Sequence, residues 1–502
     1  MCAHKTTGRK WKMKFISQKR IRSVVAGVLA AAMMTLPLSG CGQIQNININ
    51  SALGSEVSSQ AAASVVNSKS SVASKAPEAV QKAAVKASSK EVFGNSSIKK
   101  IKEDSAAQNS THLNVIRTVA QAQSGYTHID QREGYNYLPD IASRNVYKQI
   151  FQSVYKIAVK ATAEGYYPTQ KIFVSGTQLS EAQLRIILLA FLNDNPQIFW
   201  LANAYSYSYG SGGTYIQLYS VAPQSTCNTM IQKMNQKISE IIKGMPSGLN
   251  EFDRELYLFK YIADHCTYNN DAVTNNNIWQ AFSAYGVLID GKAVCEGYSR
   301  AMQLLCSYAG LQCMLLTGQS NNVNHMWNVI KINGNWYHLD ITWSDSSTLV
   351  YNYFNINDAV VTKTHTIFPS ASTLTDAQIE GKITGKAAEC NLTVPVCTAT
   401  ADNYFKVKGI KVGNLDSADD NAAIAAFTSA IQSKSASVSF YVDDSVDYDQ
   451  TLAKLVTVSP YKIQNWVLDA NTNSTGSKIN TNNLKYLTDK DNRGLTIFLS
   501  YQ

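Results

Sequence analysis

Residues 290–306 read DGKAVCEGYSRAMQLLC, and residues 324–345 read NHMWNVIKINGNWYHLDITWSD. Three residues in these runs can perform acyl chemistry together, namely Cys295, His325 and Asp340. A cysteine attacks as its thiolate, a nearby histidine can act as its base, and a carboxylate fixes the tautomer and orientation of that histidine. The pattern therefore predicts a thiol nucleophile supported by a histidine–carboxylate pair.

The turn between the two candidate strands fixes where the histidine and the carboxylate lie. Asn333-Gly334 between two alternating runs predicts a two-residue β-hairpin. In that register Trp327 faces Asp340 and His325 faces Thr342. Because side chains alternate along a strand, His325 and Asp340 become diagonal neighbours on one face, roughly 7–8 Å apart at the backbone and within side-chain reach.

Cys295 is expected to begin a helix. Large residues recur at spacings of four, three and four from Tyr298 to Ala309, which is one helical stripe, and Gly310 follows as a stop signal. Gly291 suits a tight turn into the helix. The positive end of the helix dipole lies at the N-terminus and favours a thiolate there.

The same region, from about Leu256 to His365, resembles the transglutaminase-like superfamily, whose members share a papain-like Cys-His-Asp core. The resemblance is carried by GKAVCEGYS at 291–299, HMWN at 325–328 and WYHLDITWSD at 336–345. It implies an α+β fold in which a catalytic helix packs on an antiparallel sheet.

The resemblance also assigns roles to the three residues. Cys295 is the nucleophile, His325 the base and Asp340 the group that orients the base. His338 lies on the same predicted face and is the rival base.

These roles predict a two-step acyl transfer. The Cys295 thiolate attacks an amide carbonyl, the His325 imidazolium protonates the leaving amine, and His325 then activates the incoming nucleophile. The Cys295 backbone N–H is one candidate oxyanion donor, and Tyr285 and Gln280 are candidates for the second. No metal and no organic cofactor is expected.

The sequence leaves the acceptor open. Water gives a cysteine peptidase or amidase that acts on proteins or peptides, cell-wall peptides among them, and this alternative is favoured. A lysine amine gives a cross-linking transglutaminase. A third alternative is a catalytically silent binding lipoprotein that keeps the fold.

The net charge of +9 does not indicate a nucleic-acid partner. Eight basic residues and no acidic one lie between Met1 and Arg22, and the other 37 basic residues nearly balance 36 acidic ones. A basic groove for nucleic acid is therefore not supported.

The N-terminus resembles an export signal. The basic residues are followed by an apolar run to Leu38 and then by Leu38-Ser39-Gly40-Cys41. This ending resembles the lipobox of bacterial lipoproteins, so residues 1–41 are predicted to be a lipoprotein signal peptide and Cys41 the lipid-bearing residue. The expected location is the outer side of the cell membrane. The alternatives are an ordinary signal peptide or a membrane helix, although the run is short for a span of roughly 20 residues.

Composition suggests four further segments. Residues 42–110 are rich in Ser, Ala and Lys with few aromatics, which predicts a disordered tether. An α/β N-terminal region is expected over 111–250, the catalytic core over 251–400 and a small α/β domain over 401–502.

Apolar periodicity predicts elements outside the central region as well. Helices are expected from Ser180 to before Asn195 and over 230–245, 251–265 and 420–433. Strands are expected over 215–219, 405–412, 438–442 and 496–501. Tyr205, Tyr207 and Tyr209, with the glycines that follow, are expected to form an exposed loop.

Six cysteines remain once Cys2, Cys41 and Cys295 are set aside, and they allow fifteen disulfide patterns. Cys390 and Cys397 are close in sequence and are the best candidate pair. The others are Cys227, Cys266, Cys306 and Cys313, of which the last two are expected on core faces.

Overall fold

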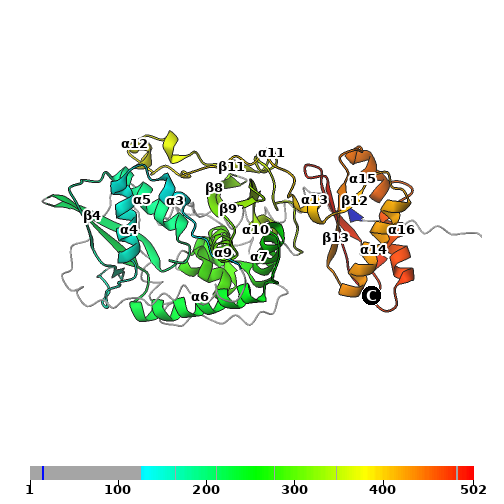
Figure 1. Cartoon of the computed structure of the whole chain (residues 1–502), viewed down its shortest axis with the longest axis horizontal. Helices are drawn as coiled ribbons and strands as arrows, with labels where there is room; N and C mark the ends of the chain where they lie inside the picture. Colours follow the sequence, from blue (N-terminus) through cyan, green and yellow to red (C-terminus); the bar gives the residue numbers. More distant parts are fainter. Residues whose placement is uncertain are drawn as a thin grey trace, which may run out of the picture. The chain divides into compact units, whose positions relative to one another are not determined.

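The structure is a computed structural model of the whole chain (Figure 1). It describes residues 14–15, 126–163, 165–210, 212–275, 278–320, 322–345, 348–481 and 484–502. The predicted tether and the lipobox at Cys41 lie outside the described residues. The chain divides into two compact units. Among the described residues, residues 126–342 and 361–398 form the catalytic unit, and residues 343–360 and 399–502, with 14–15, form the C-terminal unit.

The catalytic unit begins with helices and a small antiparallel sheet (Figure 1). Its elements are α3 (Glu133–Tyr137), α4 (Ile141–Ser153), β2 (Tyr167–Pro168), β3 (Ile172–Ser175), α5 (Glu181–Asp194), β4 (Leu201–Gly210), β5 (Gly213–Ser220) and α6 (Gln224–Gly244). Strand β5 lies between β2 and β3 in the sheet and also pairs with β4. The predicted start of α5 is confirmed, because Ser180 caps it in a reciprocal capping box with Gln183.

The expected tyrosine loop is wrong. Tyr205, Tyr207 and Tyr209 lie on β4, which forms an antiparallel hairpin with β5. Tyrosine at every second position is also a strand pattern, since aromatic residues favour strands. Gly210 and Gly213 pair with each other at the ends of the two strands, and Gly212, with a φ of 90°, lies in the tight connection between them.

The second half of the catalytic unit carries the predicted core. Its elements are α7 (Glu251–His265), β6 (Thr267–Tyr268), α8 (Asn270–Thr274), η3 (Trp279–Phe282), η4 (Gly286–Asp290), β7 (Lys292–Ala293), α9 (Cys295–Tyr308), β8 (Cys313–Ser320), β9 (Val323–Ile332), β10 (Asn335–Leu339), β11 (His365–Ile367), η5 (Ala371–Thr373) and α12 (Asp376–Ile379). Two short helices, α10 (Ile341–Ser344) and α11 (Asp358–Val361), span the points where the chain passes from one unit to the other. The antiparallel sheet has the order β10-β9-β8-β11. Helix α9 packs on it, so the α+β core with a helix on an antiparallel sheet is confirmed.

The predicted hairpin register is confirmed as far as the strands extend. Ile332 pairs with Asn335, and the pairing continues to Asn328 and Leu339. Asn333 and Gly334 have φ values of 50° and 84°, as a type I′ turn requires. The expected pairing of His325 with Thr342 is wrong, because β10 ends at Leu339 and Thr342 lies in α10.

The helix that carries Cys295 has the predicted limits. Helix α9 begins at Cys295 and ends at Tyr308, and Gly310 has the positive φ of a C′ residue, 71°. Gly291 also has a positive φ, 66°, which turns the chain toward the helix.

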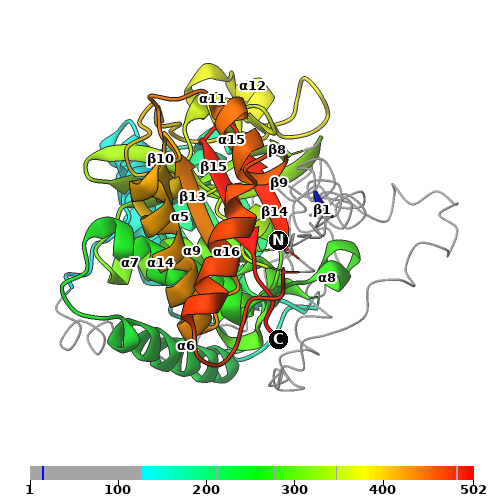
Figure 2. The ribbon, with the colours of Figure 1, turned by 90° about the vertical axis from the view of Figure 1, so that its right-hand side faces the viewer.

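The C-terminal unit is a five-stranded sheet covered by helices. Its elements are β1 (Lys14–Phe15), α13 (Tyr404–Lys408), β12 (Ile410–Val412), α14 (Ser417–Ser433), β13 (Ser437–Val442), α15 (Tyr448–Val456), α16 (Lys462–Asn473), β14 (Lys485–Asp489) and β15 (Gly494–Phe498), with the sheet order β1-β14-β15-β13-β12. Figure 2 shows α14, α15 and α16 over one face of this sheet. Phe427, Phe440 and Trp466 are buried between the two layers.

The expected strand over 405–412 is half wrong. Residues 404–408 form α13, and only Ile410–Val412 is a strand. The side chain of Asn403 accepts a hydrogen bond from the Phe405 backbone N–H and caps the helix. Phe405 and Val407 alternate like strand residues, but this cap closes a short helical turn first.

The expected disulfide between Cys390 and Cys397 is wrong. The structure forms no disulfide among the seven cysteines that it describes. Cys397 packs in an apolar cluster that includes Trp327 and Val329, whereas Cys390 lies near Tyr137. In the same described part of the chain, no helix is both long and apolar enough to cross a membrane.

Candidate active site

The predicted histidine and carboxylate meet at the end of the hairpin. His325 lies on β9, and Asp340 follows the last residue of β10. Nε2 of His325 is 2.7 Å from Oδ2 of Asp340, and the two residues are 0 % and 2 % exposed. A hydrogen bond this short between buried groups fixes the imidazole with its Nε2–H toward the carboxylate.

The third residue, Cys295, is the first residue of α9 and is 3 % exposed. The Ser299 hydroxyl lies 2.9 Å from the Cys295 carbonyl oxygen and 3.0 Å from that of Met326, which follows His325 on β9. The Asn328 side chain donates to the Ser299 carbonyl oxygen, 3.0 Å away. These bonds hold the first turn of α9 against the strand that carries the histidine.

The ionisation of His325 fits a partner of a thiol. Burial alone lowers the pKa of His325, but the charge and hydrogen bond of Asp340, followed by those of Cys295, outweigh burial and raise this pKa to about 10. The Nδ1 atom is buried and makes no regular hydrogen bond within the described residues. Because Nε2 is engaged by Asp340, Nδ1 is the nitrogen that remains for the thiol.

Asp340 binds a second histidine that carried no role in the sequence prediction. Nε2 of His365 lies 3.1 Å from the same Oδ2 atom, and Nδ1 of His365 lies 2.8 Å from the Thr364 hydroxyl. Burial alone raises the pKa of Asp340, but His325 and then His365 outweigh it and hold this pKa well below its usual range. The carboxylate is therefore ionised when it orients His325.

A glycine lets the strand of His365 reach the site. Gly318 on β8 pairs with His325 on one side and with Ile367 of β11 on the other. A Cβ at Gly318 would collide with the carbonyl oxygen of Thr366. Any larger residue would push β11, and His365 with it, away from the sheet.

His338, the rival base, lies on the predicted face and is bonded to a tryptophan. The Trp327 indole donates from Nε1 to Nδ1 of His338 over 3.1 Å. The same indole stacks on His325 with ring centroids 5.9 Å apart and an angle of 16°. His338 therefore holds the ring that covers His325, which favours His325 as the base.

Tyr268, a residue that the sequence pattern did not identify, lies against Cys295, the predicted nucleophile. Burial, followed by the charge of Cys295, raises the pKa of Tyr268 well above its ordinary value, while a hydrogen bond from the Cys295 backbone N–H opposes this shift. The Tyr268 hydroxyl is thus at the N–H that was predicted as an oxyanion donor. Its position directly after α7 on the short strand β6 left no periodic pattern to identify it.

The two side chains predicted as the second oxyanion donor, Gln280 and Tyr285, are both buried, and both lie shortly before Cys295 in the sequence. Gln280 lies in η3, and Tyr285 precedes η4 with its ring 5.1 Å from that of Phe199. Within the described residues, neither side chain makes a hydrogen bond to Cys295. Their oxyanion roles stay predictions.

The site also has the donor atoms of a possible metal ligand set. One nitrogen each of His325 and His365 and one oxygen of Asp340 lie within 4.8 Å of one another. Both histidine nitrogens are at hydrogen-bond distance from the carboxylate, so these contacts need no ion to explain them. The expectation of no metal stays a prediction.

A cysteine at a helix N-terminus beside a histidine–aspartate pair on an antiparallel sheet defines a papain-like thiol core. The sequence profile of the transglutaminase-like superfamily matches residues 239–341, which contain all three residues. Residues 239–341 are therefore similar to the transglutaminase-like superfamily.

Two curated relatives match the same part of the chain. Kyphoscoliosis peptidase of Mus musculus is 26 % identical over 159 residues, which cover 27 % of this chain and 23 % of the relative. The Homo sapiens protein is 26 % identical over 154 residues, covering 26 % and 23 %. The chain thus spans less than a quarter of the length of these relatives.

A solved structure described as a TGase aligns over 36 % of this chain and 52 % of its own, with 17 % identity and a TM-score of 0.21. A TM-score this low carries no argument about the fold.

Proposed function

We propose that this chain is an exported, lipid-anchored thiol enzyme that hydrolyses amide bonds of proteins or cell-wall peptides through Cys295, His325 and Asp340. The observation that carries the proposal is the 2.7 Å bond between His325 and Asp340 beside a cysteine at the start of α9. Sequence similarity of the core to the transglutaminase-like superfamily supports a thiol enzyme of this kind.

In the first step the Cys295 sulfur attacks the carbonyl carbon of the amide. His325 is protonated at neutral pH because its pKa is raised to about 10, so it can give its proton to the leaving amine. The ionised Asp340 stabilises the imidazolium before the transfer and keeps the ring in place after it. The product of this step is a thioester on Cys295 and a free amine.

The oxygen that becomes negative in this step needs hydrogen-bond donors. The Cys295 backbone N–H is one, and it already contacts the Tyr268 hydroxyl. The substrate oxygen therefore takes the place of this hydroxyl or lies beside it. In the second alternative the Tyr268 O–H is itself a donor, and Gln280 and Tyr285 are not required.

In the second step neutral His325 takes a proton from the incoming nucleophile, which attacks the thioester carbon. The C–S bond then breaks, which releases the acyl product and returns the Cys295 thiolate beside protonated His325. The burial of the site favours water in this role, since Cys295 is 3 % exposed and His325 is fully buried. The acceptor must reach the thioester while the acyl group still occupies the site, and water is the smallest acceptor. The curated relatives are peptidases by name, which also favours hydrolysis.

Export and anchoring rest on the sequence before residue 42, namely the basic and apolar runs that end in Leu38-Ser39-Gly40-Cys41. Cys41→Ala is expected to abolish metabolic labelling with a fatty-acid analogue and to release the protein from the membrane fraction. Unchanged labelling would contradict the lipobox interpretation without affecting the catalytic proposal.

The reaction is tested by incubating the full chain with cell-surface proteins and wall fragments and analysing the products by mass spectrometry. Hydrolysis predicts new termini or lost amides, and both should disappear in Cys295→Ala but persist in Cys306→Ala, whose cysteine lies on the same helix. Isopeptide cross-links that depend on Cys295 would support a transglutaminase instead. If neither product depends on Cys295, the chain is a silent binding protein.

A further inference from the structure

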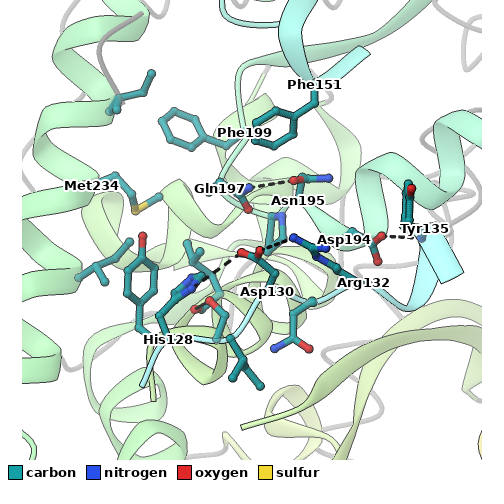
Figure 3. Close-up of a pocket in the computed structure, with 18 of the residues that line it drawn as sticks. His128, Asp130, Arg132, Tyr135, Phe151, Asp194, Asn195, Gln197, Phe199 and Met234 are labelled. Atoms are coloured by element: carbon teal, nitrogen blue, oxygen red, sulfur yellow. Dashed lines mark hydrogen bonds and ion pairs between the residues drawn. The ribbon is translucent and has the colours of Figure 1, made fainter. Parts of the chain in front are cut away.

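A cavity of about 490 Å³ lies beside the opposite end of the catalytic helix (Figure 3). Leu304, Ser307 and Tyr308 line it from the last turns of α9, whereas Cys295 is the first residue of that helix. With a rise of 1.5 Å per residue, the two ends of α9 are roughly 20 Å apart. The cavity is therefore separate from the catalytic thiol, and its volume is in the range of small-molecule sites.

One side of the cavity is apolar. This side is formed by Phe151 of α4, by Met234 of α6 and by Phe199, which precedes β4. Phe151 and Phe199 lie close to each other in Figure 3. Ile238 and Leu304 are further apolar residues of the lining. Aromatic rings and a flexible thioether suit an apolar group of irregular shape.

The polar side is formed by groups that already have partners. Asp130 lies 2.9 Å from Arg132 and 3.9 Å from Nδ1 of His128, and Figure 3 shows the three side chains joined in a row. Gln197 donates to Asn195 over 2.9 Å. A ligand cation would therefore compete with Arg132 for the carboxylate of Asp130.

The second carboxylate in the wall, that of Asp194, is also engaged. It accepts hydrogen bonds from the backbone N–H groups of Gly134 and Tyr135, at 2.8 and 2.7 Å, and from the Tyr147 hydroxyl at 3.0 Å. Asp194 thus holds α3 to α4, and its oxygens are directed to these donors rather than to a ligand.

Lys148, a cation of the cavity lining, differs from these groups because it is not paired with an acid in the described part of the chain. Lys148 is exposed on α4, and its ammonium lies 5.7 Å from the centroid of the Tyr135 ring. Among the described residues it has no acidic partner. Because Lys148 and Phe151 are three residues apart, they share one face of α4, and Lys148 places a positive charge beside the apolar side.

We propose that this cavity binds a small amphipathic carboxylate. Its aromatic or branched apolar group lies against Phe151, Phe199 and Met234, and its carboxylate meets the Lys148 ammonium at the edge of the cavity. Removing an aromatic group from water supplies most of the affinity, and the charge–charge contact selects an acid over a neutral or cationic analogue. The site does not depend on the reaction proposed for Cys295.

Three probes of equal shape test this site on the full chain: 3-phenylpropionate, 3-phenylpropan-1-ol and 3-phenylpropan-1-amine. Binding is followed by saturation-transfer NMR and isothermal titration. We expect the acid to bind about three- to fivefold more tightly than the alcohol, as an exposed charge pair allows, and the amine most weakly. Lys148→Gln should lower the affinity of the chain for the acid to its affinity for the alcohol.

The controls separate the charge from the cavity. Lys243→Gln removes an exposed lysine of α6 outside the cavity and should change none of the three affinities. Met234→Trp should abolish binding of all three probes by filling the space, and Phe151→Ala, at a half-buried position, should weaken all three if Met234→Trp does not fold. The proposal is overturned if the wild-type chain binds none of the probes, if the amine binds most tightly, or if Lys148→Gln leaves the affinity of the acid unchanged.

Discussion

The surroundings of Cys295 and the core of the C-terminal unit differ in what they bury. Near Cys295 the ionisable side chains of His325, Asp340 and His365 are almost fully buried, and so is the Glu296–Arg300 ion pair of α9. In the C-terminal unit the largest buried side chains are aromatic, and Asp420 meets Lys462 where both remain partly exposed. Burying charge is costly unless every group is paired.

This difference separates the parts that perform chemistry from those that provide stability. In the catalytic unit, two histidines share one carboxylate, so the cost of burial is offset by hydrogen bonds that also set the ionisation needed for the proposed acyl transfer. The C-terminal unit buries Phe427, Phe440 and Trp466 between sheet and helices, which stabilises it mainly through apolar contact. Packing or binding is therefore the role that we expect of it.

Breaking the pairs around Asp340 should have the largest effect. His325→Ala and Asp340→Asn are each expected to reduce turnover by about 10³- to 10⁴-fold, as in other triads, because the thiol loses its base or the base loses its orientation. His325→Ala should also slow alkylation of Cys295 by iodoacetamide near pH 6.5.

His338→Ala is the matched control, because it removes a histidine from the same face of the sheet and should lower turnover far less than His325→Ala does. If His338→Ala proved the more damaging with both variants folded, the choice of base would be wrong.

In the C-terminal unit the corresponding change should affect stability instead. Phe427→Ala removes a fully buried ring and should lower the free energy of unfolding by about 3–5 kcal/mol. Alkylation of Cys295 in the folded variant should keep its wild-type rate. Chemical denaturation and thiol labelling measure the two effects, and a large loss of labelling rate would show that this unit supports the catalytic site.

The pH dependence of stability should sharpen the same contrast. The pKa of His325 is raised from an ordinary 6.5 to about 10, so protonated His325 stabilises the fold fully below pH 6.5, and this stabilisation is lost as the pH rises toward 10. Over that window the wild type should lose on the order of a few kcal/mol of unfolding free energy relative to His325→Gln. Parallel curves for the two proteins, measured by denaturation at each pH, would argue against a buried imidazolium.

The smallest effect is expected at the second histidine. His365 is hydrogen-bonded to Asp340 and lies beside the His325 ring, with ring centroids 5.4 Å apart, but it forms no hydrogen bond with His325 among the described contacts. His365→Asn should therefore reduce turnover by about tenfold and shift the basic limb of the pH–rate profile downward. A positioning role predicts that this limb moves with little change in KM. A uniform loss of folded protein with an unchanged profile would instead indicate a purely structural histidine.

Much of the site could be predicted because its decisive parts are local. Asn333-Gly334 sets the register of a hairpin, and the stripe after Cys295 sets the start of a helix, so three catalytic candidates follow from short-range patterns. His365 could not be placed in this way. Its contact with Asp340 depends on β11 pairing with the far edge of β8, and nothing near residue 365 specifies that pairing.

The errors have a similar origin. A strand and a short capped helix compete for residues 404–408, and the cap from Asn403 decides between them. A loop and a hairpin compete for the tyrosines of β4, and pairing with β5 decides. The cavity at the end of α9 draws residues from several separate segments, so it has no sequence signature at all.

The tight turn at Asn333-Gly334 also affects the order in which the site assembles. A hairpin closes in about 1–10 μs once its strands are free, whereas docking α9 and β11 closes longer loops. The acid–base half of the site can therefore form first. During synthesis, at about 5–20 residues per second, Cys295 emerges roughly 2–6 seconds before His325. For that interval the nascent chain carries Cys295 without its histidine partner, and the proposed site is complete only when the later strands fold against the helix.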